Sequence, residues 1–266
     1  MNIIYFGTPQ IAADVLKMLV DGGVNVLAVV TKPDKPRGRS GKLACSPVKE
    51  FALKFLPNIP LYQPEKASTP TFEGEMKKYG ADLFVVFAYG EIMKQPLLDI
   101  PKEGAINLHA SLLPKYRGAA PIQYALLDGA KETGVTVIEM VLKMDAGAIL
   151  AQEKIPLHPE MNHAALEEAL KDLGGETLLR VIKNYAYHKE HKVPQNPDEA
   201  TYVQKITPQM AEIDWSQSAN TIHNQVRAFS PLPGAWTTVE VQGVSKRLKI
   251  FYVLPTQERP TYFFFN

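Results

Sequence analysis

Asn107 and His109 are the residues of this sequence whose types and spacing best fit a chemical reaction. They lie at the carboxyl end of an apolar run, Gly104–Leu108, that is typical of a buried strand. Residues at positions i and i+2 of a strand project to the same side, so the amide and the imidazole leave the strand end together. An amide can donate a hydrogen bond to a developing oxyanion, and an imidazole can move a proton near neutral pH. Acyl transfer to an amine requires both of these functions.

Asp145 is the third candidate, in the turn Met144–Gly147 between two predicted strands. An aspartate in such a turn commonly caps its own backbone in an Asx turn. Alternatively, its carboxylate lies beside His109 and fixes the orientation of the imidazole ring. The spacing in the sequence does not decide between these two interpretations.

The residues after His109 indicate a loop followed by a helix. Ser111–Pro114 end in a proline that fixes the local backbone, and Gly118–Pro121 allow close backbone approach before a helix that begins near Ile122. The amides at the N-terminus of a helix attract anionic or polar groups. This context favours a catalytic role for the Asn107 and His109 pair over a role in capping a strand end.

Lys32–Lys42 is rich in proline and glycine and carries five basic residues and one acidic residue. Such a run is commonly a solvated loop. Because it follows a predicted strand, it is also placed to act as an arm that clasps a polyanion such as RNA, and such binding would weaken steeply with salt.

Short apolar runs alternate with helical periodicity, which is typical of an α/β fold with a mostly parallel sheet. The predicted strands are Asn2–Phe6, Val24–Thr31, Asp82–Ala88, Gly104–Leu108, Thr133–Met140 and Ala148–Ile155. The predicted helices include Ile11–Val20, Val48–Leu56 and Asn162–Ala186. Ligands bind outside the carboxyl ends of strands in such sheets, so we expect three features at one edge: Ala88–Gly90, the Asn107 and His109 pair, and the turn with Asp145.

The chain is expected to divide into a large α/β domain at residues 1–186, a polar linker at 187–208 and a small β domain at 209–266. The last part has only two predicted strands, Trp236–Val241 and Lys246–Leu254. A small β domain usually needs more strands, so we interpret this domain as truncated, from a shortened or frame-shifted gene. The intact mass of the native protein tests that interpretation.

Composition limits the class of protein. The chain has 266 residues, 21% of them charged, and a net charge of +1, which excludes bulk disorder and a wholly basic surface. Cys45 is the only cysteine, so a thiolate zinc cluster is excluded, and we predict no metal site. No dinucleotide or Walker A spacing is present. The first residues lack the pattern of a signal peptide and no long apolar run follows, so we expect a cytoplasmic protein without a membrane segment.

Ten segments spread over nearly the whole chain match the motifs of one family. They are Phe6–Pro9, Lys32–Pro36, Gly38-Arg39, Ser46–Lys49, Ala88–Gly90, Asn107–Pro121, Gly134–Thr136, Asp145–Gly147, Ile213–Ser216 and Arg227–Pro231. With these segments the sequence resembles the methionyl-tRNA formyltransferase family. The Asn-x-His pair and the downstream aspartate alone would indicate only the wider superfamily of folate-dependent formyltransferases, whereas the basic segment and the last two motifs favour the tRNA enzymes.

The resemblance implies an open, mostly parallel, Rossmann-like formyltransferase domain, followed by a linker and a truncated OB-like β domain that helps to bind tRNA. It also implies 10-formyltetrahydrofolate as formyl donor and the α-amine of initiator methionyl-tRNA as acceptor. Separately, we expect a monomer. By the same resemblance Asn107, His109 and Asp145 are catalytic. The folate-binding residues are implied to be Ala88, Tyr89, Gly90, Ser111, Leu112, Leu113 and Pro114. The implied tRNA-binding residues are Lys35, Arg37, Arg39 and Lys42.

Three other functions fit the same residues. One is a formyltransferase that acts on a small amine, and another is a hydrolase that releases formate from the folate donor. Both would use the same Asn107, His109 and Asp145 set. The third is a nonenzymatic module that binds folate or RNA, against which the presence of all three catalytic residue types argues.

Overall fold

We describe a computed structural model of the chain, which covers residues 1–37 and 41–255, without the side chains of Arg37 and Lys42. Arg39 therefore lies outside the described residues. The strands are β1 Asn2–Gly7, β2 Asn25–Val30, β3 Lys35–Arg37, β4 Lys42–Ala44, β5 Leu61–Tyr62, β6 Leu83–Phe87, β7 Ala105–His109, β8 Arg117–Gly118, β9 Glu132–Glu139, β10 Ile149–Pro156, β11 Tyr202–Val203, β12 Ala235–Val241 and β13 Val244–Ile250. The helices are α1 Gln10–Asp21, α2 Pro47–Phe55, α3 Pro70–Lys77, α4 Gln95–Leu98, α5 Pro121–Leu127, α6 His163–Lys183, α7 Tyr185–Glu190 and α8 Ala219–Phe229, with 3-10 turns η1 Pro197–Glu199 and η2 Pro208–Ala211.

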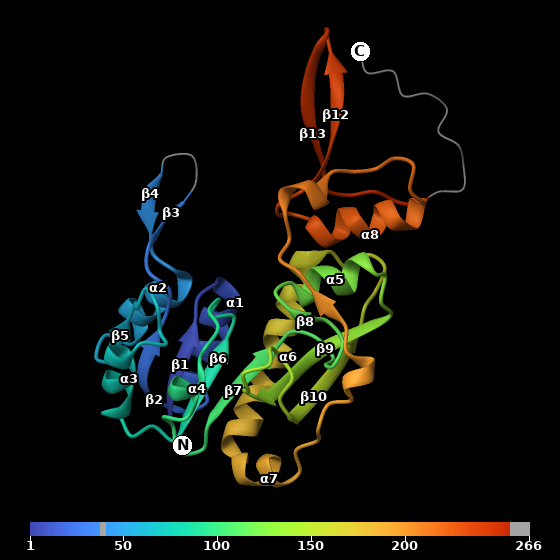
Figure 1. The fold of residues 1–266 in the computed structure, drawn as a ribbon. Helices are drawn as coiled ribbons and strands as arrows, with labels where there is room; N and C mark the ends of the chain where they lie inside the picture. Colours follow the sequence, from blue (N-terminus) through green and yellow to red (C-terminus); the bar gives the residue numbers. More distant parts are fainter. Residues whose placement is uncertain (38–40, 256–266) are drawn as a thin grey trace.

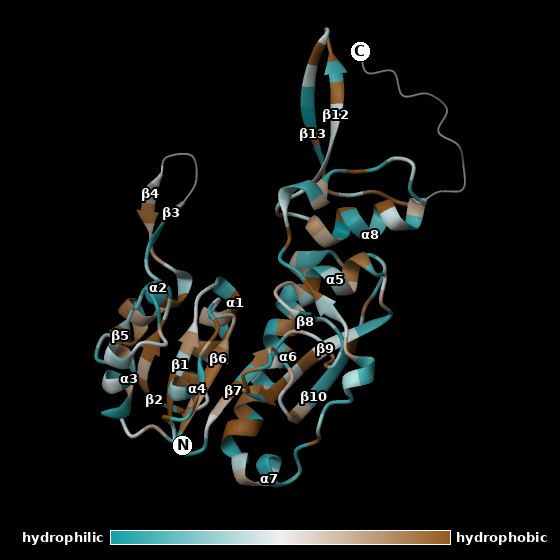
Figure 2. Cartoon of the chain, viewed as in Figure 1, coloured by the Kyte–Doolittle hydropathy of each residue, from teal (hydrophilic) through white to brown (hydrophobic). Residues whose placement is uncertain are grey.

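A seven-stranded sheet in the order β10-β9-β7-β6-β1-β2-β5 forms the centre of the larger part of the molecule (Figure 1). β5, β2, β1, β6 and β7 are parallel, whereas β9 pairs antiparallel with both β7 and β10. Parallel strands are covered on both faces and are therefore nearly continuous apolar runs, which Figure 2 shows as brown strands in the middle of the sheet. The predicted α/β class with a mostly parallel sheet is confirmed.

Two apolar clusters cover the two faces of the sheet. On one face, side chains such as Tyr5, Val85 and Leu108 pack with helices α1, α2, α5 and α6. On the other face, side chains such as Phe6 and Val86 pack with α3 and α4. Because neighbouring residues of a strand point to opposite faces, each strand contributes to both clusters.

Several of these helices have a side-chain cap at the N-terminus, which sets the residue at which the helix begins. Ser46 and Thr69 accept hydrogen bonds from the backbone amides of Lys49 and Phe72, and each is followed by a proline in the first helical turn. Such caps satisfy amides that have no partner inside the helix. The cap at Ser46 fixes where the chain re-enters the domain after the basic segment.

The direction of β9 changes one expectation. Its last residues lie beside Ala105 and Ile106, the first residues of β7, because β9 runs antiparallel to β7. The turn after Met140 therefore leaves the sheet at the opposite end from Ala88–Gly90 and His109, so the expectation that this turn follows the carboxyl end of a parallel strand was wrong. The expected meeting of Asp145 with His109 is nevertheless observed, with 3.8 Å between the two side chains. An apolar run specifies a buried strand but not the direction in which the strand runs.

The predicted helix over residues 162–186 is two helices, α6 and α7, which meet at Asn184. The segment 187–208, expected to be a linker, contains the end of α7, the 3-10 turn η1 and the strand β11. β11 pairs in parallel with β8, in register Tyr202 to Arg117 and Val203 to Gly118. This segment is thus hydrogen-bonded to the loop that follows β7.

After this segment come α8 and the hairpin of β12 and β13, which extends away from α8 in Figure 1. Ile213, Val226 and Ala235 form a small apolar cluster between these elements. Most of β13 is exposed. Within residues 1–37 and 41–255, no helix has the length and apolar character needed to cross a membrane.

Candidate active site

The side chains of Asn107 and His109 project from β7 on the face of the sheet that also packs against α3 and α4. Their neighbours Ile106 and Leu108 are buried in the cluster on the opposite face. His109 is 6% exposed and Asn107 is half-buried. Among the described residues, no hydrogen bond of the half-buried Asn107 side-chain amide is found, so its N–H groups can serve a ligand.

Asp145 reaches the same place by a loop that folds back over the sheet. One oxygen of its carboxylate, Oδ2, lies 3.8 Å from Nδ1 of His109 and accepts a hydrogen bond of 2.8 Å from the backbone N–H of Gly118. The 3.8 Å separation exceeds a hydrogen bond but makes an ion pair when the imidazole is protonated. We call Asn107, His109 and Asp145 the polar cluster.

The hydrogen bond at the second ring nitrogen of His109 assigns its tautomer. Nε2 lies 2.9 Å from the carbonyl oxygen of Tyr116. A carbonyl only accepts, so Nε2 carries the proton of the neutral imidazole, and the free lone pair is at Nδ1. Nδ1 is the nitrogen that faces Asp145. The ring can therefore take a second proton at the atom nearest the carboxylate.

Thr136 and Gln152 brace the loop Ser111–Pro114. Neither was predicted as a site residue, although Thr136 lies in the matching segment Gly134–Thr136. The Thr136 hydroxyl donates to the Ser111 carbonyl (2.6 Å) and accepts from the Leu113 amide (3.1 Å). Gln152 donates to the Leu113 carbonyl and to the Thr136 hydroxyl, at 2.9 Å in both cases. The register places Thr136 beside both His109 and Gln152, and this pairing cannot be read from the sequence.

Ala88–Gly90 follow β6, the strand next to β7. Ala88 and Gly90 are exposed and have positive φ angles of 48° and 83°, so the backbone turns sharply here. Tyr89 is buried, and burial raises the pKa of its phenol well above the usual value. Its hydroxyl has no hydrogen-bond partner among the described residues. The segment therefore combines open backbone with one unpaired polar atom.

The basic segment, residues 32–42, is anchored at its base. Asp34 accepts hydrogen bonds from Lys49 Nζ (2.7 Å) and Gln63 Nε2 (2.8 Å), and the bond from Lys49 is the main reason that its pKa is lowered. Lys32 forms an ion pair of 2.5 Å with Glu91. Lys35 is exposed in β3, which with β4 stands away from the sheet in Figure 1. We call this segment the basic arm.

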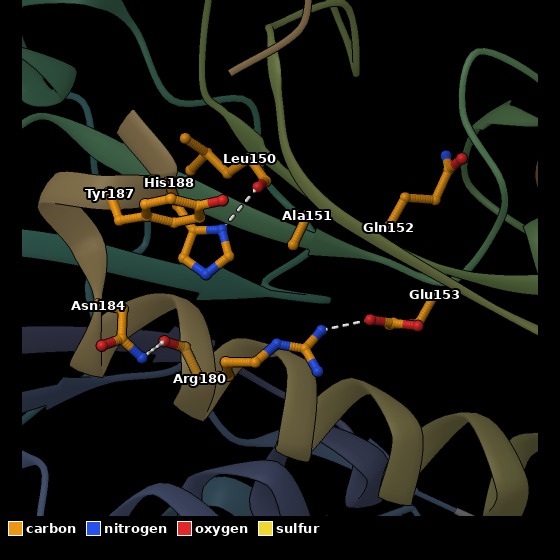
Figure 3. A pocket seen from close by; sticks show the side chains of 8 residues that line it. All are labelled: Leu150, Ala151, Gln152, Glu153, Arg180, Asn184, Tyr187 and His188. Atoms are coloured by element: carbon orange, nitrogen blue, oxygen red, sulfur yellow. Dashed lines mark hydrogen bonds and ion pairs between the residues drawn. The ribbon is translucent and has the colours of Figure 1, made fainter. Parts of the chain in front are cut away.

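A separate cavity of about 680 Å³ lies on the other face of the sheet, between β10 and the helices α6 and α7. Figure 3 shows Arg180 paired with Glu153, and His188 bonded to the carbonyl of Leu150. None of the predicted site residues lines this cavity. Its charged side chains Arg180 and Glu153 are paired with each other, so among the described residues the cavity lacks the combination of amide, imidazole and carboxylate found in the polar cluster. Within the described part of the chain, no three His, Cys, Asp or Glu side chains are grouped to hold a metal.

Two family profiles match the chain. Residues 1–182 match the formyl transferase family, and residues 205–261 match the C-terminal domain of formyl transferases. The chain is 50% identical over 250 residues to the methionyl-tRNA formyltransferase of Protochlamydia amoebophila, which covers 94% of this chain and 78% of that protein. It is 46% identical over 239 residues to the enzyme of the same name from Listeria monocytogenes, covering 90% and 76%.

Solved structures show the same fold at low sequence identity. A 4-N formyltransferase from Francisella tularensis superposes with a TM-score of 0.72 at 16% identity, over 95% of this chain and 98% of that one. A sugar 3N-formyl transferase, solved with dTDP and 5-N-formyl-THF, superposes with a TM-score of 0.62 at 22% identity, over 86% and 79%.

Proposed function

This chain belongs to the formyl transferase family, and we infer that it transfers a formyl group from 10-formyltetrahydrofolate to the free α-amine of methionyl-tRNA. The observation that carries the proposal is the polar cluster: a free amide, an imidazole and a carboxylate on one face of the sheet, with His109 Nδ1 3.8 Å from Asp145. The identity of about half the residues with methionyl-tRNA formyltransferases supports tRNA as the acceptor.

The residues of the polar cluster divide the work of the transfer. The α-amine has an ordinary pKa of about 8, so a large share of it is neutral in a site that excludes water. As the amine nitrogen bonds to the formyl carbon, negative charge develops on the formyl oxygen, and Asn107 donates a hydrogen bond to that oxygen. His109 takes the proton of the amine at Nδ1, where the Asp145 carboxylate stabilises the resulting imidazolium. The imidazolium then returns the proton to the folate nitrogen as the carbon–nitrogen bond breaks.

The segments around the cluster fit the folate donor. Ala88–Gly90 and Ser111–Pro114 follow the adjacent strands β6 and β7, so both can contact one flat ring system beside Asn107. The exposed backbone at Ala88 and Gly90 and the half-buried amide of Asn107 provide polar groups for the donor. When bound, the donor supplies the formyl carbon.

The acceptor side of the proposal rests on the basic arm. Lys35, Arg37, Arg39 and Lys42 would contact tRNA phosphates, since clustered basic side chains bind the nucleic acid backbone. The acceptor is the initiator methionyl-tRNA, and the enzyme acts as a monomer in the cytoplasm. Residues 1–186 form the catalytic domain, 187–208 the connection and 209–266 an OB-like domain that helps to bind tRNA. The limits of the two family matches support this division.

The test is to incubate the protein with 10-formyltetrahydrofolate and methionyl-initiator tRNA and to assay for formylmethionine. Formylmethionyl-tRNA is the expected product, and elongator methionyl-tRNA should react more slowly. Formylation of a small amine but not of tRNA would instead support a small-molecule transferase. Release of formate without transfer would support the hydrolase, and folate binding without turnover would support a binding module.

A further inference from the structure

We propose that Gln195 is a positioning residue for Asp145, which makes the segment between the two domains part of the active site. This proposal rests on the function inferred above and concerns the same site. Residues 183–204 lie outside both family matches, and residue 195 sits in a polar, proline-containing stretch.

The side-chain amide of Gln195 uses all of its hydrogen-bonding groups at the site. Its Nε2 donates to the backbone carbonyls of Asp145 and Gly147, at 2.8 Å each. Its Oε1 accepts from Nε (3.1 Å) and Nη2 (2.7 Å) of Arg117. The Arg117 guanidinium is buried and also contacts the hydroxyl of Tyr202. Gln195 thus joins the loop that carries Asp145 to the strand that carries Gly118.

The pairing of β8 with β11 completes the support of Asp145. The amides of Arg117 and Ala119 donate to the carbonyls of Thr201 and Val203. Successive N–H groups of a strand point to opposite edges, so the amide of Gly118, between them, points away from β11 and donates to the Asp145 carboxylate. A side chain at position 118 would come within 2.2 Å of the Val203 carbonyl, so only glycine allows this approach.

The same segment also supports His109 indirectly, through Tyr116. The hydroxyl of Thr201 accepts from the amide of Tyr116 at 2.8 Å, and the carbonyl of Tyr116 accepts from His109 Nε2. The segment 195–203 therefore fixes the backbone on both sides of the 3.8 Å contact between His109 and Asp145. Displacement of about 1 Å at such a contact can lower a rate about hundredfold.

The test uses Gln195→Glu in the full chain, assayed for formyl transfer to methionyl-tRNA. Glutamate keeps the acceptor for Arg117 but presents oxygens to the two carbonyls that Nε2 holds, so the Asp145 loop should move. We expect kcat to fall roughly tenfold to hundredfold, with the KM values for tRNA and folate donor within about twofold of wild type. Asn58→Asp is the matched control: it makes the same change from amide to carboxylate at an exposed residue in the turn after α2, outside the segment 195–203, and kcat should not change.

A double-variant cycle separates positioning of Asp145 from a general structural role. In an Asp145→Asn background, Gln195→Glu should cause less than about a twofold further loss, because both changes disable the same group. The proposal would be overturned if the losses of kcat in the two single variants multiplied in the double variant. It would also be overturned if Gln195→Glu had wild-type kcat, or a raised KM with unchanged kcat. If thermal unfolding shows that Gln195→Glu is not folded, Gln195→Met decides by the same criteria. A wild-type protein that formylates no tRNA would instead refute the proposed function.

Discussion

The polar cluster and the basic arm both belong to the part of the chain that includes the large sheet, but they are held in different ways. His109 and Asp145 are 6% and 14% exposed and are fixed by backbone groups of Tyr116 and Gly118. The basic arm is fixed at its base through Asp34, and its Lys35 faces solvent. Acyl transfer depends on atomic positions, whereas attraction to phosphates acts over about 10 Å at 0.1 M salt and needs no fixed side-chain geometry.

The largest effect should come from the Asn107 amide. In Asn107→Ala the hydrogen bond to the developing oxyanion is lost, which typically costs about 3–4 kcal/mol of barrier. We expect kcat to fall by hundreds-fold with a small change in the KM for tRNA, measured by steady-state formylation. A loss of less than about tenfold in a folded variant would contradict the assignment of Asn107.

Asp145→Asn should have the next largest effect. The variant keeps the size of the side chain but removes the charge beside His109 Nδ1, so the imidazolium is less stable when it forms. A positioned acid–base group contributes about 10²–10⁴-fold, and Asp145 acts only through His109, so we expect a loss of kcat near the lower limit. The pre-steady-state rate of transfer measures this loss. An unchanged rate would show that the His109 contact has no part in catalysis.

Lys35→Ala sharpens the contrast, because it should change binding and leave kcat intact. Loss of one phosphate contact should raise the KM for tRNA several-fold at low salt and reduce the slope of log affinity against log salt by about 1. Lys77→Ala, an exposed lysine in α3, is the control and should behave as wild type. A fall in kcat for Lys35→Ala at saturating tRNA would break the proposed division between site and arm.

Asp34→Asn should have the smallest effect. The variant loses the ion pair with Lys49 but keeps a side chain that can accept from Gln63, so we expect about a twofold rise in the KM for tRNA. The folded-state pKa of Asp34 is lowered, so its anchoring is present near neutral pH and is lost only as the pH falls through that lowered value, below its usual range of about 4. Titration of Asp34 should therefore cause no change in the wild-type KM for tRNA between about pH 6 and 8. The prediction would be contradicted if the wild-type KM for tRNA changed between about pH 6 and 8 and the KM of Asp34→Asn did not.

The sequence predicted the fold class and the positions of most sheet strands, because buried parallel strands are apolar runs that stand out from their surroundings. It did not predict the direction of β9, which runs antiparallel to β7. The expected proximity of Asp145 and His109 is observed, at 3.8 Å, but a loop that returns along the sheet produces it, not the carboxyl end of a parallel strand. The catalytic roles of Asn107, His109 and Asp145 remain predictions.

The supporting residues could not be predicted. Thr136 and Gln152 meet only through the register of β9 and β10, and Gln195 lies in a polar segment with the composition of a linker. A single polar residue carries no local pattern, and its partners are set by tertiary structure. The residues that could be found in advance are those whose own chemistry marks them, such as an amide and an imidazole at one strand end.

The most direct test of the central claim is the single-turnover rate of formyl transfer at saturating methionyl-tRNA for wild type, Asn107→Ala and Lys35→Ala. If the polar cluster catalyses transfer and the basic arm only binds tRNA, Lys35→Ala should have the wild-type rate and Asn107→Ala a rate that is hundreds-fold lower. Equal losses in the two variants, or a near-wild-type rate for Asn107→Ala, would contradict it.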